Sequence, residues 1–166
     1  MRHTVAPRVL VIVILSVLAL ALTPAFAEVP EDGVIDPGHG IGPAALGMTA
    51  DKLLESLGKA DFQKDNDDGT TLYEWGLLNQ GDLPDAVLWV LVDSGSVAKV
   101  GTDGGKYQTS TGLGVGSSPE DFVKAFGFPA KNPAPGFYVF RQGIGIAVGT
   151  NGNVHTIWIE QTPGQQ

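Results

Sequence analysis

The chain has 166 residues and a formal net charge of −8, with 10 Lys and Arg against 18 Asp and Glu, and it contains no cysteine. The absence of cysteine excludes disulfide bonds, thiolate nucleophiles, Cys-ligated metals and lipidation on cysteine. The acidic balance argues against a nucleic-acid partner, because nucleic-acid-binding surfaces need clusters of Lys and Arg.

Residues 1–27 have the pattern of a cleaved signal peptide. Arg2 and Arg8 provide a positive start, residues 9–22 form an apolar run, and small residues precede the expected cleavage before Glu28. The apolar run would span about 21 Å as a helix, which is short of the roughly 30 Å hydrocarbon core, so a retained membrane anchor is the weaker alternative. The sequence predicts export to the periplasm or the outside of the cell, with no membrane insertion after cleavage.

Residues 28–166 are expected to form a single mature domain. Removing residues 1–27, which hold two basic and no acidic side chains, leaves 139 residues with 8 basic and 18 acidic ones, a net charge of −10. A chain of this length can bury about two-thirds of the surface that its unfolded form exposes, whereas half of it would be marginal alone.

The mature chain contains a degenerate internal repeat, with repeat one at about 41–102 and repeat two at about 111–160. Three blocks recur in the same order, and they pair 46–58 with 115–127, 72–75 with 137–140, and 94–100 with 151–157. After an extended lead-in over 28–40, each repeat is expected to begin with one short helix and to continue as a β-meander.

Both predicted helices carry start and stop signals. Thr49 and Ser118 are expected N-caps, Pro119 suits the first helical position, and Gly58 and Gly127 suit the positive φ found after a helix. The apolar residues of each helix fall on one stripe, so each helix should pack by one face only.

The strands are expected at 71–78, 86–92 and 96–101 in the first repeat and at 136–141, 143–149 and 153–160 in the second. The turns at 93–96 and 150–153 favour hairpins, and residues 79–85 are expected to form a longer acidic loop. These elements predict an α+β fold in which two degenerate helix-plus-β-meander repeats form one antiparallel sheet. The helices should cover one face of this sheet and leave the other face partly open.

Each repeat enters its helix through an apolar residue and a glycine, followed by a Thr or Ser cap, and a glycine stands at the helix end. This pattern resembles the tandem-repeat β-lactamase inhibitory protein fold. It also resembles the single-repeat SmpA/OmlA-type lipoproteins of the outer-membrane assembly machinery. The resemblance covers about residues 41–160 and implies a non-catalytic exported domain that binds proteins through the face of its sheet. The chain lacks the disulfides of the inhibitors and the lipidated cysteine of the lipoproteins, so no target and no contact residue is carried over.

A hydrolase is the alternative function. The string Val34-Ile35-Asp36-Pro37-Gly38-His39-Gly40 resembles the strand-end motif of zinc-dependent N-acetylmuramoyl-L-alanine amidases, which implies a zinc ligand at His39, and Glu55 follows at a similar spacing. Such a site needs a further His around an open zinc position, and the mature chain offers only His155. We therefore expect no metal site and no cofactor. The acidic stretch 64–69 is interpreted as a solvated turn, with weak calcium binding left open because it does not match an EF-hand loop.

Trp158 is the main candidate contact residue. It shares strand parity with Thr156 and Glu160, opposite Ile157 and Ile159, so it should face the open side of the sheet as a solvent-facing anchor. The alternative is that Trp158 covers a sheet edge or packs under the other half.

Trp89 is included in this candidate partner-binding set, which comprises Trp158, Thr156, Glu160 and Trp89. The sequence as a whole predicts an exported, non-catalytic protein-binding module of the cell envelope or the extracellular space. Its net charge of −10 favours a partner with basic patches.

Overall fold

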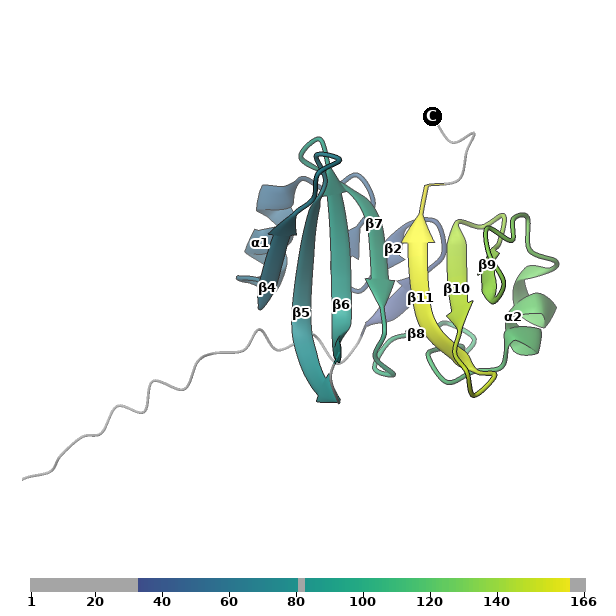
Figure 1. Ribbon diagram of the computed structural model, residues 1–166. Helices are drawn as coiled ribbons and strands as arrows, with labels where there is room; N and C mark the ends of the chain where they lie inside the picture. Colours follow the sequence, from purple (N-terminus) through teal and green to yellow (C-terminus); the bar gives the residue numbers. More distant parts are fainter. Residues whose placement is uncertain (1–32, 81–82, 162–166) are drawn as a thin grey trace, which may run out of the picture.

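One layer of the protein is a seven-stranded antiparallel sheet with the strand order β4–β5–β6–β7–β11–β10–β9 (Figure 1). The computed structural model describes residues 33–80 and 83–161, so the predicted signal peptide lies outside the described residues. The strands of this sheet are β4 (Phe62–Asp65), β5 (Thr71–Gln80), β6 (Leu83–Asp93), β7 (Ser96–Thr102), β9 (Phe137–Val139), β10 (Ile144–Val148) and β11 (Val154–Glu160).

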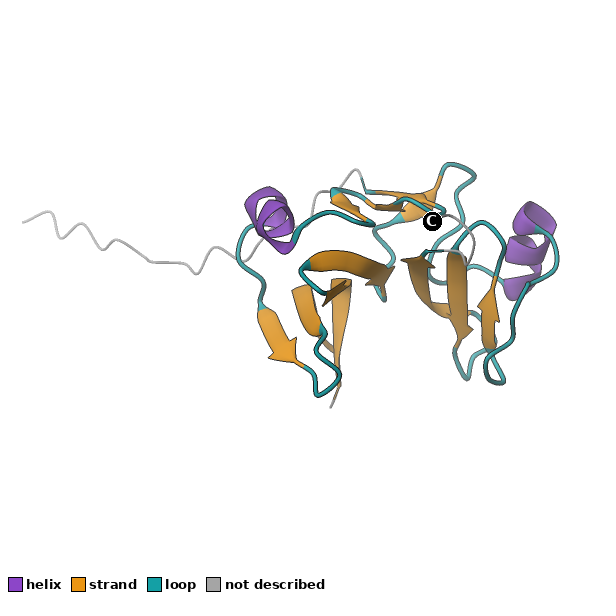
Figure 2. Cartoon of the chain, turned by 90° about the horizontal axis from the view of Figure 1, so that it is seen from above, coloured by secondary structure: helices purple, strands orange, loops and turns teal. Residues whose placement is uncertain are grey.

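The second layer lies on one side of this sheet. It consists of helix α1 (Ala50–Leu57), helix α2 (Pro119–Phe126) and a small sheet with the order β3–β2–β1–β8. Figure 2 shows this layer above an arched large sheet, whose concave side is left uncovered. The strands of the small sheet are β1 (Val34–Asp36), β2 (Gly40–Ile41), β3 (Ala44–Ala45) and β8 (Gln108–Thr109). The expected α+β architecture, with both helices on one face of an antiparallel sheet, is confirmed.

The segments that lead into the two helices make the same hydrogen bonds. The Gly47 N–H donates to the carbonyl of Val97, whose own N–H donates to Met48, at 2.8 Å in both cases. The Gly116 N–H likewise donates to the carbonyl of Val154 at 2.8 Å, and the Val154 N–H donates to Ser117 at 2.9 Å. Both glycines have positive φ, at 76° and 94°. Each helix is therefore tied by the same pair of bonds to the last strand of its own meander.

The predicted caps bound both helices. The Thr49 hydroxyl accepts from the Lys52 N–H, and the Ser118 hydroxyl accepts from the Asp121 N–H. The glycines that end the helices have positive φ, but their ψ of −169° at Gly58 and −166° at Gly127 is extended rather than left-handed helical. The chain thus leaves each helix abruptly and turns back toward the sheet.

The two halves join through β7 and β11, which pair antiparallel from Lys99 opposite Glu160 to Thr102 opposite Ile157. Their core is continuous across this seam. It contains Leu53 of α1, Phe122 of α2 and the inward-facing residues of the strands, and Ile35, Ile41 and Tyr107 extend it beneath the small sheet.

Three expectations about the chain path were wrong. The lead-in is not simply extended, because its described part contributes β1 and β2, with a turn at 37–39 between them. The edge strand β4 was not foreseen, since its four residues are all exposed and show no alternation. Residues 79–85 form no long acidic loop: β5 and β6 pair as far as Gln80 opposite Leu83, which leaves only residues 81–82 as the connection.

Phe122 tests the predicted packing of α2. Its side chain is fully buried, with ring centroids 5.9 Å from Phe126 and 6.3 Å from Phe140. We expect Phe122→Ala to lower the free energy of unfolding by about 3–5 kcal/mol, because it leaves a cavity between the layers. Urea unfolding measures this, with Phe128→Ala as the matched control, since the Phe128 side chain is 87% exposed. A loss below about 1 kcal/mol for Phe122→Ala would mean that α2 packs by another face.

Candidate functional site

The uncovered face of the large sheet carries the residues that the sequence singled out. Ile157 and Ile159 of β11 are fully buried in the core, so the alternating residues Thr156, Trp158 and Glu160 lie on the opposite face. This is the side of the sheet that neither helix covers (Figure 2).

Two tryptophans on this face lie across glycines of neighbouring strands. Trp89 is opposite Gly101, Gly101 is also opposite Trp158, and Trp158 is opposite Gly145. A Cβ atom on Gly101 would overlap the Trp89 indole, and one on Gly145 would overlap the Trp158 indole. The glycines therefore make room for the rings to lie flat on the sheet.

The contacts of Trp158 correct one expectation about it. Its ring centroid is 6.3 Å from that of Phe137, and Nζ of Lys99 lies 5.6 Å above the indole. Its Nε1–H donates to Oε2 of Glu160 at 3.0 Å, and the same oxygen is 2.9 Å from Nζ of Lys99. These neighbours leave the side chain only 7% exposed. Trp158 thus faces the open side as predicted, but it is not the solvent-facing anchor that the sequence suggested, because Gly145, Lys99 and Phe137 all lie against its indole.

The four candidate residues meet in one groove of about 920 Å³. Trp89, Thr156, Trp158 and Glu160 all line it, and we call it the Trp158 groove. Residues of β7, β9 and β10 complete it, together with a segment beside β9 that includes Lys131 and Pro133.

Sequence reasoning missed the other residues that line the groove, among them Phe137, Lys99 and Lys131. Phe137 is 44% exposed on the groove, and strand parity could have placed it there, because its neighbour Tyr138 packs against the core on the other face. Strand parity also places Lys99 on the groove side of β7, because the next residue, Val100, is buried in the core. No local pattern points to Lys131, which reaches the groove because its backbone bridges to Val139 at the outer side of β9.

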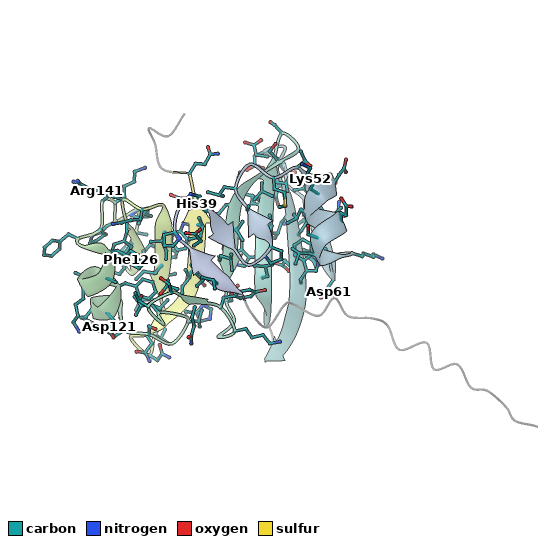
Figure 3. All side chains as sticks on the ribbon, turned by 180° about the vertical axis from the view of Figure 1, so that it is seen from behind. His39, Lys52, Asp61, Asp121, Phe126 and Arg141 are labelled. Atoms are coloured by element: carbon teal, nitrogen blue, oxygen red, sulfur yellow. The ribbon has the colours of Figure 1, made fainter. Side chains whose placement is uncertain are left out.

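The residues of the alternative hydrolase site do not converge. His39 lies on the side of the molecule that carries the small sheet (Figure 3), is 78% exposed in its side chain, and pairs with Asp36 at 3.3 Å. His155 lies on β11 at the groove, where its Nδ1 is 3.1 Å from the Thr156 hydroxyl. Among the described residues, no group of three or more His, Cys, Asp or Glu side chains is arranged to hold a metal ion.

The acidic stretch 64–69 covers the last two residues of β4 and most of the turn that leads to β5. Its carboxylates accept local hydrogen bonds, from the Thr71 hydroxyl to Asp65 at 2.8 Å and from the Thr70 hydroxyl to Asp68 at 2.7 Å. The bonds from Thr70 lower the pKa of Asp68. This arrangement is the solvated turn that the sequence indicated.

No helix in the described part of the chain is long and apolar enough to cross a membrane.

Comparisons with known proteins identify the fold and no family. No protein-family model matches the chain, and no curated protein matches it significantly. The uncharacterized protein YfeY from Escherichia coli is similar in structure, with a TM-score of 0.51 and 16% identity over 75% of this chain and 97% of that one. A cysteine-rich secretory protein from Staphylococcus aureus has a TM-score of 0.50 and 13% identity, over 76% of this chain and 47% of that one.

An extracellular protein containing an SCP domain, from Bacillus anthracis, has a TM-score of 0.48 and 12% identity, over 70% of this chain and 44% of that one. This chain thus spans less than half the length of the Staphylococcus aureus and Bacillus anthracis proteins.

The resemblance to β-lactamase inhibitory proteins and SmpA/OmlA-type lipoproteins is wrong, because the similar structures are YfeY and a cysteine-rich secretory protein instead. The quoted motif encodes a capped helix entered through a glycine, as Gly47 with Thr49 and Gly116 with Ser118 show. Any fold that turns a strand sharply into a short helix can use that motif, so it does not identify a family.

Gly145 provides a test of the ring-on-glycine packing. Its φ is not positive, so alanine would fit the backbone, and the expected cost comes only from displacing the Trp158 indole. We expect Gly145→Ala to lower the free energy of unfolding by about 1–3 kcal/mol, as for other overpacked sites. The control is Gly105→Ala, since nothing lies within 4 Å of a Cβ at Gly105. Equal urea midpoints for the two variants would show that the indole does not rest on Gly145.

Metal analysis tests the hydrolase alternative at His39. Because no three ligands converge in the described part of the chain, we expect the purified mature protein to contain no stoichiometric zinc. Inductively coupled plasma mass spectrometry measures the zinc content after incubation with zinc and desalting. Stoichiometric zinc that disappears in His39→Ala would contradict this expectation and restore the hydrolase.

Proposed function

We propose that the chain is an exported, non-catalytic protein-binding module that holds its partner on the uncovered face of the large sheet, in the Trp158 groove. The observation that carries the proposal is the combination of this groove with a half-exposed aromatic ring, Phe137, which lies 6.3 Å from the nearly buried ring of Trp158. Interfaces concentrate their binding energy in aromatic residues and Arg that are set in such depressions.

The surroundings of Phe137 support this role. The ring is supported by Trp158 and is therefore held in place before a partner arrives, which lowers the entropy cost of binding. The groove joins apolar surface to the polar side chains of Thr156, His155 and Glu160. A mixed surface of this kind is typical of sites that associate reversibly.

Charge and compartment complete the proposal. The mature chain's net charge of −10 favours a partner whose surface carries basic patches, through faster encounter more than through tighter contact. Glu74 of β5 lies opposite Trp89 and adds acidic surface beside the groove. Burial raises the pKa of Glu74, and Asp103 raises it to a lesser extent. Export to the periplasm or the outside of the cell is supported by the pattern of residues 1–27 and is compatible with the fold shared with a secretory protein.

The experiment compares two exposed phenylalanines. We expect Phe137→Asp to abolish the capture of specific partners from a native envelope and culture-medium fraction, whereas Phe128→Asp retains it, because Phe128 is 87% exposed and does not line the groove. Quantitative mass spectrometry of the captured proteins is the measurement, and thermal unfolding verifies that both variants are folded. Partners that bind the wild type and Phe137→Asp equally would place the interface elsewhere and contradict the proposal.

A further inference from the structure

The charges and spacing of the Trp158 groove define a class of occupant. We propose that the groove binds an extended protein segment in which two carboxylates flank an aromatic or proline residue. This inference rests on the proposed protein-binding function and specifies the segment that would be recognised.

The groove is locally cationic on an acidic protein. Lys99 and Lys131 line it, together with His155, and Glu160 is the one carboxylate among the described lining residues. Glu160 is already bound by Nζ of Lys99 at 2.9 Å and by Nε1 of Trp158 at 3.0 Å. Lys131 forms no ion pair with any residue that the structure describes. The unbalanced charge inside the groove is therefore positive.

The two lysines stand at opposite sides of the groove. Lys99 is on β7, and Lys131 lies beyond β9 through its bridge to Val139, so the sheet order places four strand spacings between them. Four spacings amount to about 19 Å, which an extended peptide covers with about six residues. Carboxylates about six residues apart therefore reach both lysines at once, one pairing with Lys131 and the other joining Glu160 at the ammonium of Lys99, which has three N–H donors.

Apolar surface occupies the space between the lysines. The half-exposed ring of Phe137 lies on β9, between β7 and Lys131 in the sheet order, and Pro133 and Trp89 also line the groove. Grooves lined by aromatic rings hold extended, proline-containing peptides well, because such peptides lose little conformational freedom on binding. The segment would cross the strands rather than extend the sheet at an edge.

This local chemistry differs from that of the molecule as a whole. The acidic surface around Glu74, near Asp103, lies beside the groove rather than in it. A partner with an acidic segment and a basic surrounding surface would thus satisfy both the groove and the net charge. Aromatic grooves also suit neutral sugars, but a neutral sugar would leave the positive charge of Lys131 without an anionic partner.

The test uses synthetic peptides and isothermal titration calorimetry. The probe is a ten-residue peptide with two aspartates six residues apart that flank a central Phe-Pro, and matched peptides carry asparagine or lysine in place of both aspartates. We expect the aspartate peptide to bind the wild type about tenfold more tightly than the asparagine peptide, as two partly exposed ion pairs allow, and to weaken with salt. Lys131→Glu should remove this preference. Lys106→Glu, an equal change of charge at an exposed site outside the groove, should retain it.

The possible outcomes separate the two proposals. Equal binding of the aspartate and asparagine peptides, or tighter binding of the lysine peptide, would overturn the acidic specificity while the groove remained a peptide site. Binding of chitohexaose with no binding of any peptide would overturn the inference and count against the protein-binding function as well. Failure of every probe would overturn the inference alone, since the capture experiment with Phe137→Asp judges the proposed function independently.

Discussion

A sheet that is covered on only one side must shield its other side with its own side chains. The seven-stranded sheet of this protein does so by laying tryptophan rings over glycines of adjacent strands, Trp89 over Gly101 and Trp158 over Gly145. A flat indole covers much backbone and apolar surface, and the missing Cβ atoms let it approach closely. The same packing leaves a hollow beside the rings, so the shielding of the sheet and the shape of the groove have one cause.

The groove also depends on the way in which the two halves join. Neither half would bury enough surface alone, and pairing of β7 with β11 merges their sheets and cores. That pairing brings Lys99 of the first half to Glu160 of the second and sets Gly101 beside Trp158. The candidate site therefore exists only in the joined domain, which explains why its residues come from β6 at one end of the groove and from the segment beside β9 at the other.

Local signals were sufficient to predict much of the fold. The caps at Thr49 and Ser118 and the parity of β11 depend on a few neighbouring residues, and the structure has them as expected. The strands β1, β2, β3 and β8 have only two or three residues each, too few for a periodic pattern, and β8 joins the small sheet only by pairing with the distant β1.

The candidate site was predicted only in part, for a similar reason. The alternation of side chains along β11 predicted the side of the sheet on which Trp158 lies. Its burial depends on Phe137, on Lys99 and on Gly145 in other strands, and no local pattern reports those contacts. The family resemblance was wrong because it rested on helix-entry geometry alone.

Two indole rings lie against glycines on the uncovered face of the large sheet, and both line the Trp158 groove. Nuclear magnetic resonance of the labelled protein detects this packing through the Hα signals of Gly101 and Gly145. We expect ring currents to shift both signals strongly upfield, with cross-relaxation from Trp89 to Gly101 and from Trp158 to Gly145. Unshifted glycine signals without these cross-peaks would contradict it, because the rings would then not rest on the sheet and the groove would not have this shape.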